Sequence, residues 1–310
     1  MYIPLHGHST FSFLEAISSP AKIVKRAKEI GMYAIAITDF GGMYGLPAFT
    51  QAAKDGDIKA ILGVELGFVL DLNANIIGKQ IGNIVLLAKT QEGYQNLMKL
   101  TSFANQEGLG IKPKIDFNKL KEFKEGIIVI SGGTESWIGK MINAGEKEER
   151  ILEIHQMIRE TCGEDYYLEI IAQDEHEKKA LRDVNQLCLS FSEKTGVKCI
   201  INNEFFYPEV QDYHTREIAL AIRDNLKMYD PTRRQPKGKF HLMTEQEIID
   251  ICISNGYTAE QISERIQNNE QIAENINAKI IFGSGFFPKY DTPANIQKIY
   301  EENKDTLIEF

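Results

Sequence analysis

Short apolar segments alternate with helical patterns along most of the chain. The apolar segments have the length of β-strands, and we expect strands at residues 2–5, 33–38, 59–70, 84–89, 127–131, 166–171 and 198–202. Helical periodicity separates them at residues 20–30, 46–54, 91–105, 147–161 and 175–195. Strands that are apolar on both faces and separated by helices are typical of a parallel sheet covered by helices. The pattern therefore predicts an α/β fold, built either as a (βα) barrel or as a doubly wound sheet.

The pattern becomes helical after about residue 210. We expect helices at residues 211–222, 244–254 and 258–273, with a polar basic loop, DPTRRQPKGK, at residues 230–239. The last segment, residues 287–310, has the pattern of a connector followed by one polar helix. The sequence shows no internal repeat and no low-complexity tract, and we interpret the helical part as a C-terminal extension of the α/β domain.

Composition and charge narrow the range of functions. The 310 residues carry a formal net charge of −9 and are 43% hydrophobic, which is ordinary for a globular protein. An acidic chain is poorly suited to wrapping nucleic acid, although it is compatible with a local basic patch. The apolar runs fall short of the roughly 18 residues of a membrane helix, and the N-terminus lacks the pattern of a secretion signal. Four cysteines without CxxC spacing indicate reduced thiols, so we expect a cytoplasmic protein that binds no membrane.

Histidines and carboxylates stand near the ends of three successive predicted strands. His6 and His8 follow the first strand and point to the same side of an extended chain, so both can reach one cation. Asp39 and Glu65 lie near the ends of the next two strands. Because strand ends meet at the mouth of a barrel, these four residues predict a site for zinc or a hard cation. The alternative interpretation is a hydrogen-bonded histidine pair, with Asp39 capping a turn and Glu65 paired with a lysine.

Ordered motifs spread over nearly the whole chain resemble one known family. They are LHGHSTFSFLEA (5–16), AIAITDFGGMYGLPAFTQAAKDGDIKAILGVEL (34–66), NIVLLAKTQEGYQNLMKL (83–100), IIVISGG (127–133), INNEFFYPEVQDYHTREIALAI (201–222), FHLMTEQEI (240–248) and FFPKY (286–290). Together they resemble the polymerase and histidinol phosphatase (PHP) domain at the N-terminus of the bacterial DNA polymerase III alpha subunit. The stretch LLAKTQEGYQNLMKL favours the polymerase branch over stand-alone PHP phosphatases.

The resemblance implies a fold and a domain organisation. Residues 1–285 would form a distorted (βα)7 PHP barrel with a helical C-terminal extension, and residues 286–310 would connect this barrel to a polymerase palm. The parent family is a DNA-directed DNA polymerase, a nucleotidyltransferase. The acidic motifs of a palm are absent from these 310 residues, so we do not expect them to polymerise DNA by themselves. We expect the chain to be either a fragment or a naturally short product.

The resemblance also implies a metal site at the strand ends, which holds up to three ions and supports phosphoesterase or 3′–5′ exonuclease activity where its ligand set is complete. Four positions that carry a histidine or cysteine ligand in the family are Phe40, Asn83, Gly133 and Phe206. The remaining candidate ligands, two of which stand where the family usually has aspartate, are His6, His8, Glu15, Asp39, Glu65 and Glu204. Since phenylalanine cannot ligate a metal, we expect no catalytic residues, and either no metal or one residual zinc or manganese ion.

The same resemblance implies a role in DNA replication. Family members with a degenerate site leave proofreading to a separate exonuclease subunit, which their PHP domain docks. We therefore expect a non-catalytic scaffold whose partners are that exonuclease subunit, the remainder of the polymerase and, in the full replicase, DNA. The alternatives are a metal-dependent 3′–5′ exonuclease or phosphoesterase with an altered ligand set, and a phosphatase of the histidinol phosphate type. Candidate nucleic-acid contacts, in a run that is also typical of a solvated loop, are Arg233, Arg234, Lys237 and Lys239.

Overall fold

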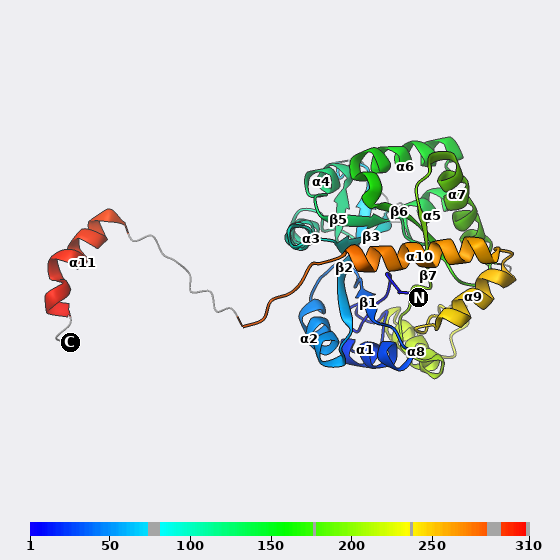
Figure 1. Ribbon diagram of the computed structural model, residues 1–310, viewed down its shortest axis with the longest axis horizontal. Coiled ribbons are helices and arrows are strands. Elements are labelled where there is room, and N and C mark those ends of the chain that lie inside the picture. The colour runs from blue at the N-terminus through cyan, green and yellow to red at the C-terminus, as the bar shows by residue number, and fades with distance from the viewer. Residues whose placement is uncertain (74–80, 176–177, 236–237, 284–292, 308–310) are drawn as a thin grey trace. The chain divides into compact units, whose positions relative to one another are not determined.

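The computed structural model describes residues 1–73, 81–175, 178–235, 238–283 and 293–307. Contacts within the chain divide it into two units, Met1–Lys279 and Ile280–Phe310 (Figure 1). In the second unit the described residues form the helix α11 (Ala294–Leu307), where the sequence predicts a polar helix. Lys237, the FFPKY motif and the part of the predicted connector before residue 293 lie outside the described residues.

One curled sheet forms the centre of the first unit (Figure 1). Its strands follow the order β1-β2-β3-β5-β6-β7, and β4 pairs with β2. The bounds are β1 (Ala34–Ile37), β2 (Lys59–Val69), β3 (Gly82–Ala88), β4 (Lys114–Asp116), β5 (Ile127–Ile130), β6 (Tyr166–Ile171) and β7 (Cys199–Asn202). Neighbouring strands are parallel except β3, which runs antiparallel to β2 and β5. The expected α/β fold with a distorted barrel is confirmed.

The antiparallel strand β3 corrects the expectation of a uniformly parallel sheet. All seven residues of β3 are buried, so its sequence has the same apolar character as that of the parallel strands. The connection decides the direction instead. Residues 70–81 join β2 to β3 without a helical sequence pattern, whereas a parallel crossover usually contains a helix. The direction of a strand that is buried on both faces therefore cannot be deduced from its hydrophobic pattern.

The predicted strand at residues 2–5 is not a regular strand, but this segment closes the sheet. The carbonyl oxygens of Pro4 and Gly7 accept hydrogen bonds from β1 and the residue after it, at 3.0 and 2.8 Å, and the amide of His8 donates to Phe205, beyond β7, at 2.9 Å. The buried side chain of Asn269 joins the same parts by donating to carbonyl oxygens of the N-terminal segment and of β7. The segment therefore lies between the two ends of the strand order and completes a barrel.

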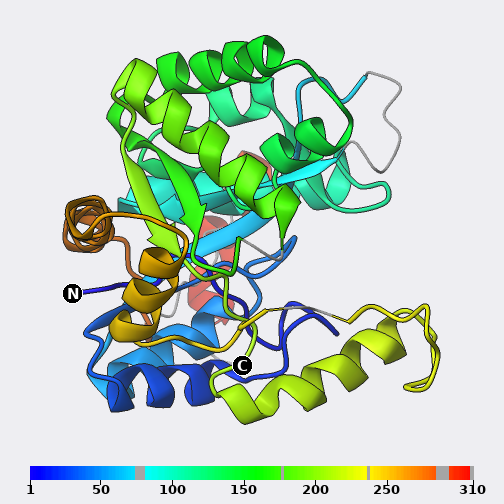
Figure 2. The same cartoon turned by 90° about the vertical axis from the view of Figure 1, so that its right-hand side faces the viewer.

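Helices cover the barrel on its outside. They are α1 (Pro20–Glu29), α2 (Leu46–Gly56), α3 (Gln91–Gln106), α4 (Phe117–Glu122), α5 (Trp137–Asn143), α6 (Glu148–Cys162), α7 (Lys179–Thr195), α8 (Tyr213–Arg223), α9 (Glu245–Ser254) and α10 (Ala259–Asn275). Figure 2 shows α6 and α7 on one side of the strands and α1 and α8 on the opposite side. The helices agree with the predicted ranges within a few residues. The exceptions are α4 and α5, which are too short to show a helical period.

Apolar side chains fill the barrel, and α10 closes one end of it. Ile272, Ala273 and Ile276 of α10 pack in one buried cluster with residues of the N-terminal segment and of β1, β2, β3, β5 and β7. Figure 1 shows α10 lying across the middle of this unit. All four cysteines are free thiols, and three of them are buried. Within the described ranges, no helix is both long and apolar enough to span a membrane.

Candidate functional site

Four of the predicted ligands meet in one group. His6 and His8 come from the N-terminal segment, Glu65 from β2 and Glu204 from the loop after β7, and one ligand atom of each lies within 4.8 Å of the others. Glu204 has a φ of 52°, in the left-handed region that costs a non-glycine residue about 1 kcal/mol or more. Desolvation by burial raises the pKa of Glu204 to about 7, and the charge of Glu65 adds to this effect. The backbone at Glu204 thus adopts an unfavourable conformation, and this conformation places its carboxyl group beside other acids.

His6 lies between two buried carboxylates. Its Nε2 is 2.8 Å from Glu65 Oε2, and its Nδ1 is 3.0 Å from Glu169 Oε1. Desolvation lowers the pKa of His6, but the charges of Glu169 and Glu65 and the hydrogen bonds to both outweigh it and raise the pKa well above its usual value. Without a metal, His6 is therefore an imidazolium that bridges two acids. The sequence interpretation missed Glu169, although a lone glutamate in the apolar strand YYLEII was a usable signal.

His8 is a neutral imidazole with a free nitrogen. The Ser12 hydroxyl donates to Asp39 Oδ1 at 2.7 Å, so we assign it as the acceptor from His8 Nδ1 at 3.3 Å. Desolvation, and after it the charge of His6, lowers the pKa of His8 well below its usual value. His8 Nε2 then carries a lone pair, and this buried nitrogen has no hydrogen-bond partner among the described residues. It lies 3.4 Å from Glu65 Oε2, an arrangement that a cation between the two atoms would stabilise.

Two of the positions predicted to have lost a ligand place aromatic rings against His8. The ring centroids of Phe40 and Phe206 lie 4.1 and 4.6 Å from that of His8, and both rings are nearly parallel to it. The guanidinium of Arg216 covers Phe206, with its carbon 3.7 Å from the ring centroid. Desolvation lowers the pKa of Arg216 to about 10. Apolar packing therefore occupies the two positions at which the family resemblance implies histidine ligands.

Asn83 and Gly133, the other two positions predicted to have lost a ligand, differ in their surroundings. The Asn83 amide donates to Glu65 Oε1 at 2.5 Å, and its oxygen accepts from the ammonium of Lys112. At Gly133 a Cβ atom would lie 2.8 Å from Ile171 Cγ1, so a larger residue would require a shift of that side chain. Asn83 therefore holds a ligand of the group instead of binding a metal, and Gly133 is closely packed.

Two predicted ligands stand outside the four-residue group. Asp39 accepts three hydrogen bonds of 2.7 Å, from the amide and hydroxyl of Ser9 and from the hydroxyl of Ser12. Desolvation raises the pKa of Asp39, although these hydrogen bonds lower it in part. The Glu15 carboxylate forms an ion pair with Arg223. Both acids thus have partners within the protein.

A cleft of about 630 Å³ opens over the group. Glu65 and Glu204 line it together with aromatic and basic side chains, which are Phe11, Phe13, Phe40, Tyr44, Phe206, Phe240, Lys112, Arg216 and Arg234. Phe13 and Tyr44 are 79% and 69% exposed. His6, His8 and Glu65 are buried and Glu204 is half-buried, so solvent and small ions can approach the group through an aromatic cleft.

The predicted basic loop is paired with acids. Arg233 donates to Glu217 at 2.9 Å, and Arg234 donates twice to Asp224, at 2.8 and 2.6 Å. The backbone amide of Lys239 donates to a glutamine side chain. Their role as nucleic-acid contacts stays a prediction.

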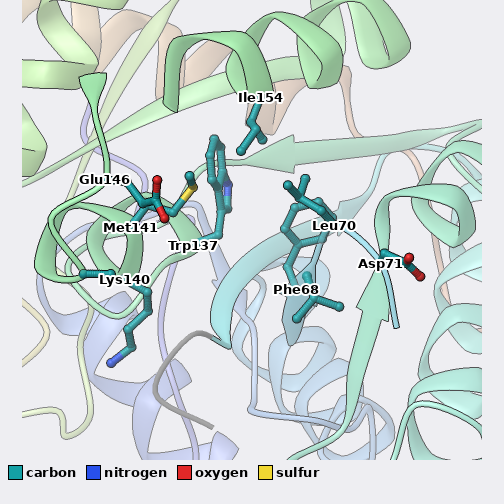
Figure 3. Close-up of a pocket in the computed structure, with 10 residues that line it drawn as sticks. Phe68, Leu70, Asp71, Trp137, Lys140, Met141, Glu146 and Ile154 are labelled. Atoms are coloured by element: carbon teal, nitrogen blue, oxygen red, sulfur yellow. The ribbon is translucent and has the colours of Figure 1, made fainter. Parts of the chain in front are cut away.

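A second hollow lies between β2 and α5. It measures about 220 Å³ and is mainly apolar, and Figure 3 shows Trp137 standing between Met141 on one side and Leu70 and Phe68 on the other. The buried indole nitrogen of Trp137 has no hydrogen-bond partner in the described ranges. This hollow shares no residue with the four-residue group and has the character of a gap in the packing.

The four-residue group fits one divalent cation. Two imidazoles and two carboxylates are a donor set suited to zinc or manganese, and His8 Nε2 is a free lone pair within it. An ion there would displace the proton between His6 and Glu65. Glu169 would stay on Nδ1 of His6, in the carboxylate–histidine arrangement that orients metal ligands. Further ions would need further ligands, and the substituted positions supply none.

Comparison with known protein families shows the class of protein to which this chain belongs. The family profile of the PHP domain matches residues 4–173, more than half of the chain. The chain therefore belongs to the PHP domain family, and the resemblance seen in the motifs is confirmed.

Curated relatives refine this assignment. The chain is 29% identical over 314 residues to the DNA polymerase III subunit alpha of Borreliella burgdorferi, covering 99% of this chain and 26% of that protein. It is 29% identical over 293 residues to the same subunit of Escherichia coli (strain K12), covering 94% of this chain and 24% of that protein. The chain thus spans about a quarter of the length of these relatives.

Solved structures resemble the chain more distantly. A two-domain protein from Bacteroides vulgatus containing a predicted PHP-like metal-dependent phosphoesterase is 13% identical, with a TM-score of 0.43 over 66% of this chain and 52% of that one. An amidohydrolase from Chromobacterium violaceum is 15% identical, with a TM-score of 0.39 over 67% of this chain and 88% of that one.

Proposed function

We propose that this chain works in DNA replication as the PHP domain of a DNA polymerase III alpha-type replicase in the cytoplasm. Similarity to alpha subunits over 94% of the chain or more supports this proposal. In it, residues 1–285 are the PHP barrel domain with its helical extension, and residues 286–310 lead toward the polymerase palm. The partners are the remainder of the polymerase, DNA in the full replicase and a proofreading exonuclease subunit that the domain docks as a non-catalytic scaffold.

The packing around His8 is the observation that carries the non-catalytic part of the proposal. Phe40 and Phe206 contact the His8 ring where a metal-rich site would have ligands. Phosphoester hydrolysis of this class uses two or more cations, one to generate hydroxide and one to stabilise the leaving oxygen. A single zinc or manganese ion would supply only the first of these. The chain's own residues would then hold that ion without completing a hydrolytic site.

Two measurements on the full chain test this function. The chain and the proofreading exonuclease subunit of the same organism should co-elute as one complex in size-exclusion chromatography. Elemental analysis of the purified chain should find at most one equivalent of zinc or manganese. Separate elution of the two proteins at micromolar concentrations would contradict the scaffold, and two or more equivalents of metal would contradict the non-catalytic site.

The second candidate function is a metal-dependent 3′–5′ exonuclease or phosphoesterase with an altered ligand set. The free lone pair of His8, on a nitrogen 3.4 Å from Glu65 Oε2, favours it. Hydrolysis of a 3′-labelled single-stranded oligonucleotide, stimulated by manganese and abolished in His8→Gln, would support this function. Equal hydrolysis by the wild type and His8→Gln would exclude the group as its site.

A further inference from the structure

The two acids that contact His6 need more positive charge than its single imidazolium provides. Glu65 and Glu169 are 3% and 0% exposed, and each contacts His6. A buried carboxylate is costly unless it is paired with positive charge and its remaining lone pairs accept hydrogen bonds. One Glu65 oxygen faces His6, and the other accepts from the Asn83 amide. The residue that binds the oxygen of the Asn83 amide therefore affects the charge balance around Glu65.

Strand pairing brings Lys112 to this place. Strand β4 pairs with β2 in parallel, with Gly67 opposite Lys114, and the amide of Gly67 donates to the carbonyl oxygen of Pro113 at 3.0 Å. Along the same edge of β2, Phe40 occupies the position beside Glu65, so Lys112 lies in the chain that leads into β4 and not in a strand pair with Glu65. The pairing of β4 with β2 holds this part of the chain close to the group, and the Lys112 ammonium reaches the Asn83 oxygen.

The Asn83 amide connects Lys112 to the group. Its nitrogen donates to Glu65, so its oxygen is turned away from that carboxylate, and this oxygen accepts from the Lys112 ammonium. A histidine at position 83 could not both bind a metal ion and connect Lys112 to Glu65 through hydrogen bonds, as Asn83 does. Lys112 is half-buried and lines the cleft over the group. In the lower dielectric of such a site, its charge acts on Glu65 more strongly than it would in water.

We propose that Lys112 is a built-in counter-cation of the group, which supplies through Asn83 the positive charge that a second metal ion would otherwise bring. The charge of Lys112 stabilises the metal-free group and repels an incoming divalent cation. The group then takes up at most one ion, and only weakly. This inference concerns the metal chemistry of the group and is independent of whether the chain docks an exonuclease.

The test compares three variants of the full chain with the wild type. Lys112→Met removes the charge and keeps much of the side-chain length, whereas Lys112→Arg keeps the charge. Lys114→Met is the matched control, because Lys114 lies two residues away and donates to the Gly108 carbonyl oxygen at 3.0 Å, not to the group. Zinc affinity is measured by isothermal titration calorimetry, and the melting temperature is measured with chelator and with zinc.

Lys112→Met should bind zinc about tenfold more tightly than Lys114→Met, or tighter still, because a repelling charge is gone. Its melting temperature should be lower than that of the wild type in chelator and should rise more on adding zinc, since metal that binds only the native state stabilises it. Lys112→Arg should stay close to the wild type in both measurements.

Two outcomes would overturn the proposal. One is a zinc affinity of Lys112→Met within about twofold of Lys114→Met, including the case in which neither binds zinc. The other is an equal loss of melting temperature in Lys112→Met and Lys112→Arg, which would assign the effect to packing.

Discussion

His8 and His155 have nearly the same immediate surroundings, yet only one of them belongs to a candidate site. Both are fully buried, both have a Nδ1 within hydrogen-bond distance of a hydroxyl, and both lack a described partner at Nε2. Each also lies against aromatic rings, which for His155 are those of Trp137 and Phe191. Desolvation lowers the pKa of both imidazoles. Burial, ring stacking and a free nitrogen therefore do not define a site.

The difference lies in what faces the free nitrogen. His8 Nε2 has the carboxylate of Glu65 at 3.4 Å and belongs to a group that also contains Glu204. For His155, desolvation is the cause of the lowered pKa, with no carboxylate acting on it. Buried carboxylates placed around an imidazole are what make it a candidate metal ligand. This comparison suggests three experiments, ordered by the size of the expected effect.

Removal of a carboxylate should give the largest effect. Glu169→Ala leaves a buried His6 imidazolium with one acid instead of two and deprives the Asn202 amide of its acceptor. Breaking a buried charge pair from one side costs about 3–5 kcal/mol, so the free energy of unfolding should fall by that amount in urea denaturation. Glu169→Gln keeps an oxygen for Asn202 and should lose less. Equal losses in the two variants would show that charge is not what matters at this position.

The acid-dependent stability of His155 should give a smaller effect. Burial lowers the pKa of His155 to about 3, against about 6.5 in the unfolded chain. Below pH 6.5 the unfolded state binds more protons than the folded state, so the free energy of unfolding falls as the pH falls toward 3. Between pH 7 and 5 this contribution amounts to about 2 kcal/mol, and His155→Phe should lack it. The contribution of His6 to stability has the opposite pH dependence. It is present at low pH and is lost as the pH rises through the raised pKa of His6.

Urea denaturation of the wild type and His155→Phe at both pH values measures this difference. Other titrating groups contribute equally to both proteins and cancel. Hydrogen bonding to Tyr166 is lost at both pH values and cancels as well. The same change of stability with pH in the two proteins would mean that His155 is protonated in the folded state, contrary to the comparison with His8.

The sequence predicts much of the fold because local patterns specify it. An apolar run predicts β2 and an amphipathic pattern predicts α3. Both elements begin and end within a few residues of their predicted bounds. His6, His8 and Glu65 were recognisable because they follow or interrupt buried strands, where polar groups are expensive. Glu169 meets the same criterion within β6 and could have been found by it.

Features that depend on tertiary pairing could not be predicted in this way. Lys112 stands in a polar loop whose composition resembles that of any other loop, and only the pairing of β4 with β2 brings it near Glu65. The antiparallel direction of β3 likewise depends on a connection and not on its own residues. The family resemblance predicts that Phe40 and Phe206 stand at former ligand positions, but their contacts with the His8 ring depend on the three-dimensional arrangement.

The smallest expected effect concerns the tautomer of His8, and two serines allow a matched test. Ser9 and Ser12 each donate a hydroxyl hydrogen bond of 2.7 Å to Asp39, but only Ser12 also contacts His8 Nδ1. Ser12→Ala should therefore free the imidazole to place its proton on Nε2, where it blocks a cation. Loss of a group that orients a ligating histidine lowers metal affinity by about tenfold or more.

Ser9→Ala removes a similar hydrogen bond from Asp39 and leaves His8 untouched, so its zinc affinity should stay close to that of the wild type. Calorimetric titration of both variants with zinc measures the ratio. If Ser9→Ala and Ser12→Ala lose affinity equally, Asp39 and not the His8 tautomer controls the group. A loss confined to Ser12→Ala would show that the free nitrogen of His8, unlike that of His155, is held ready for a cation by the hydroxyl on its opposite side.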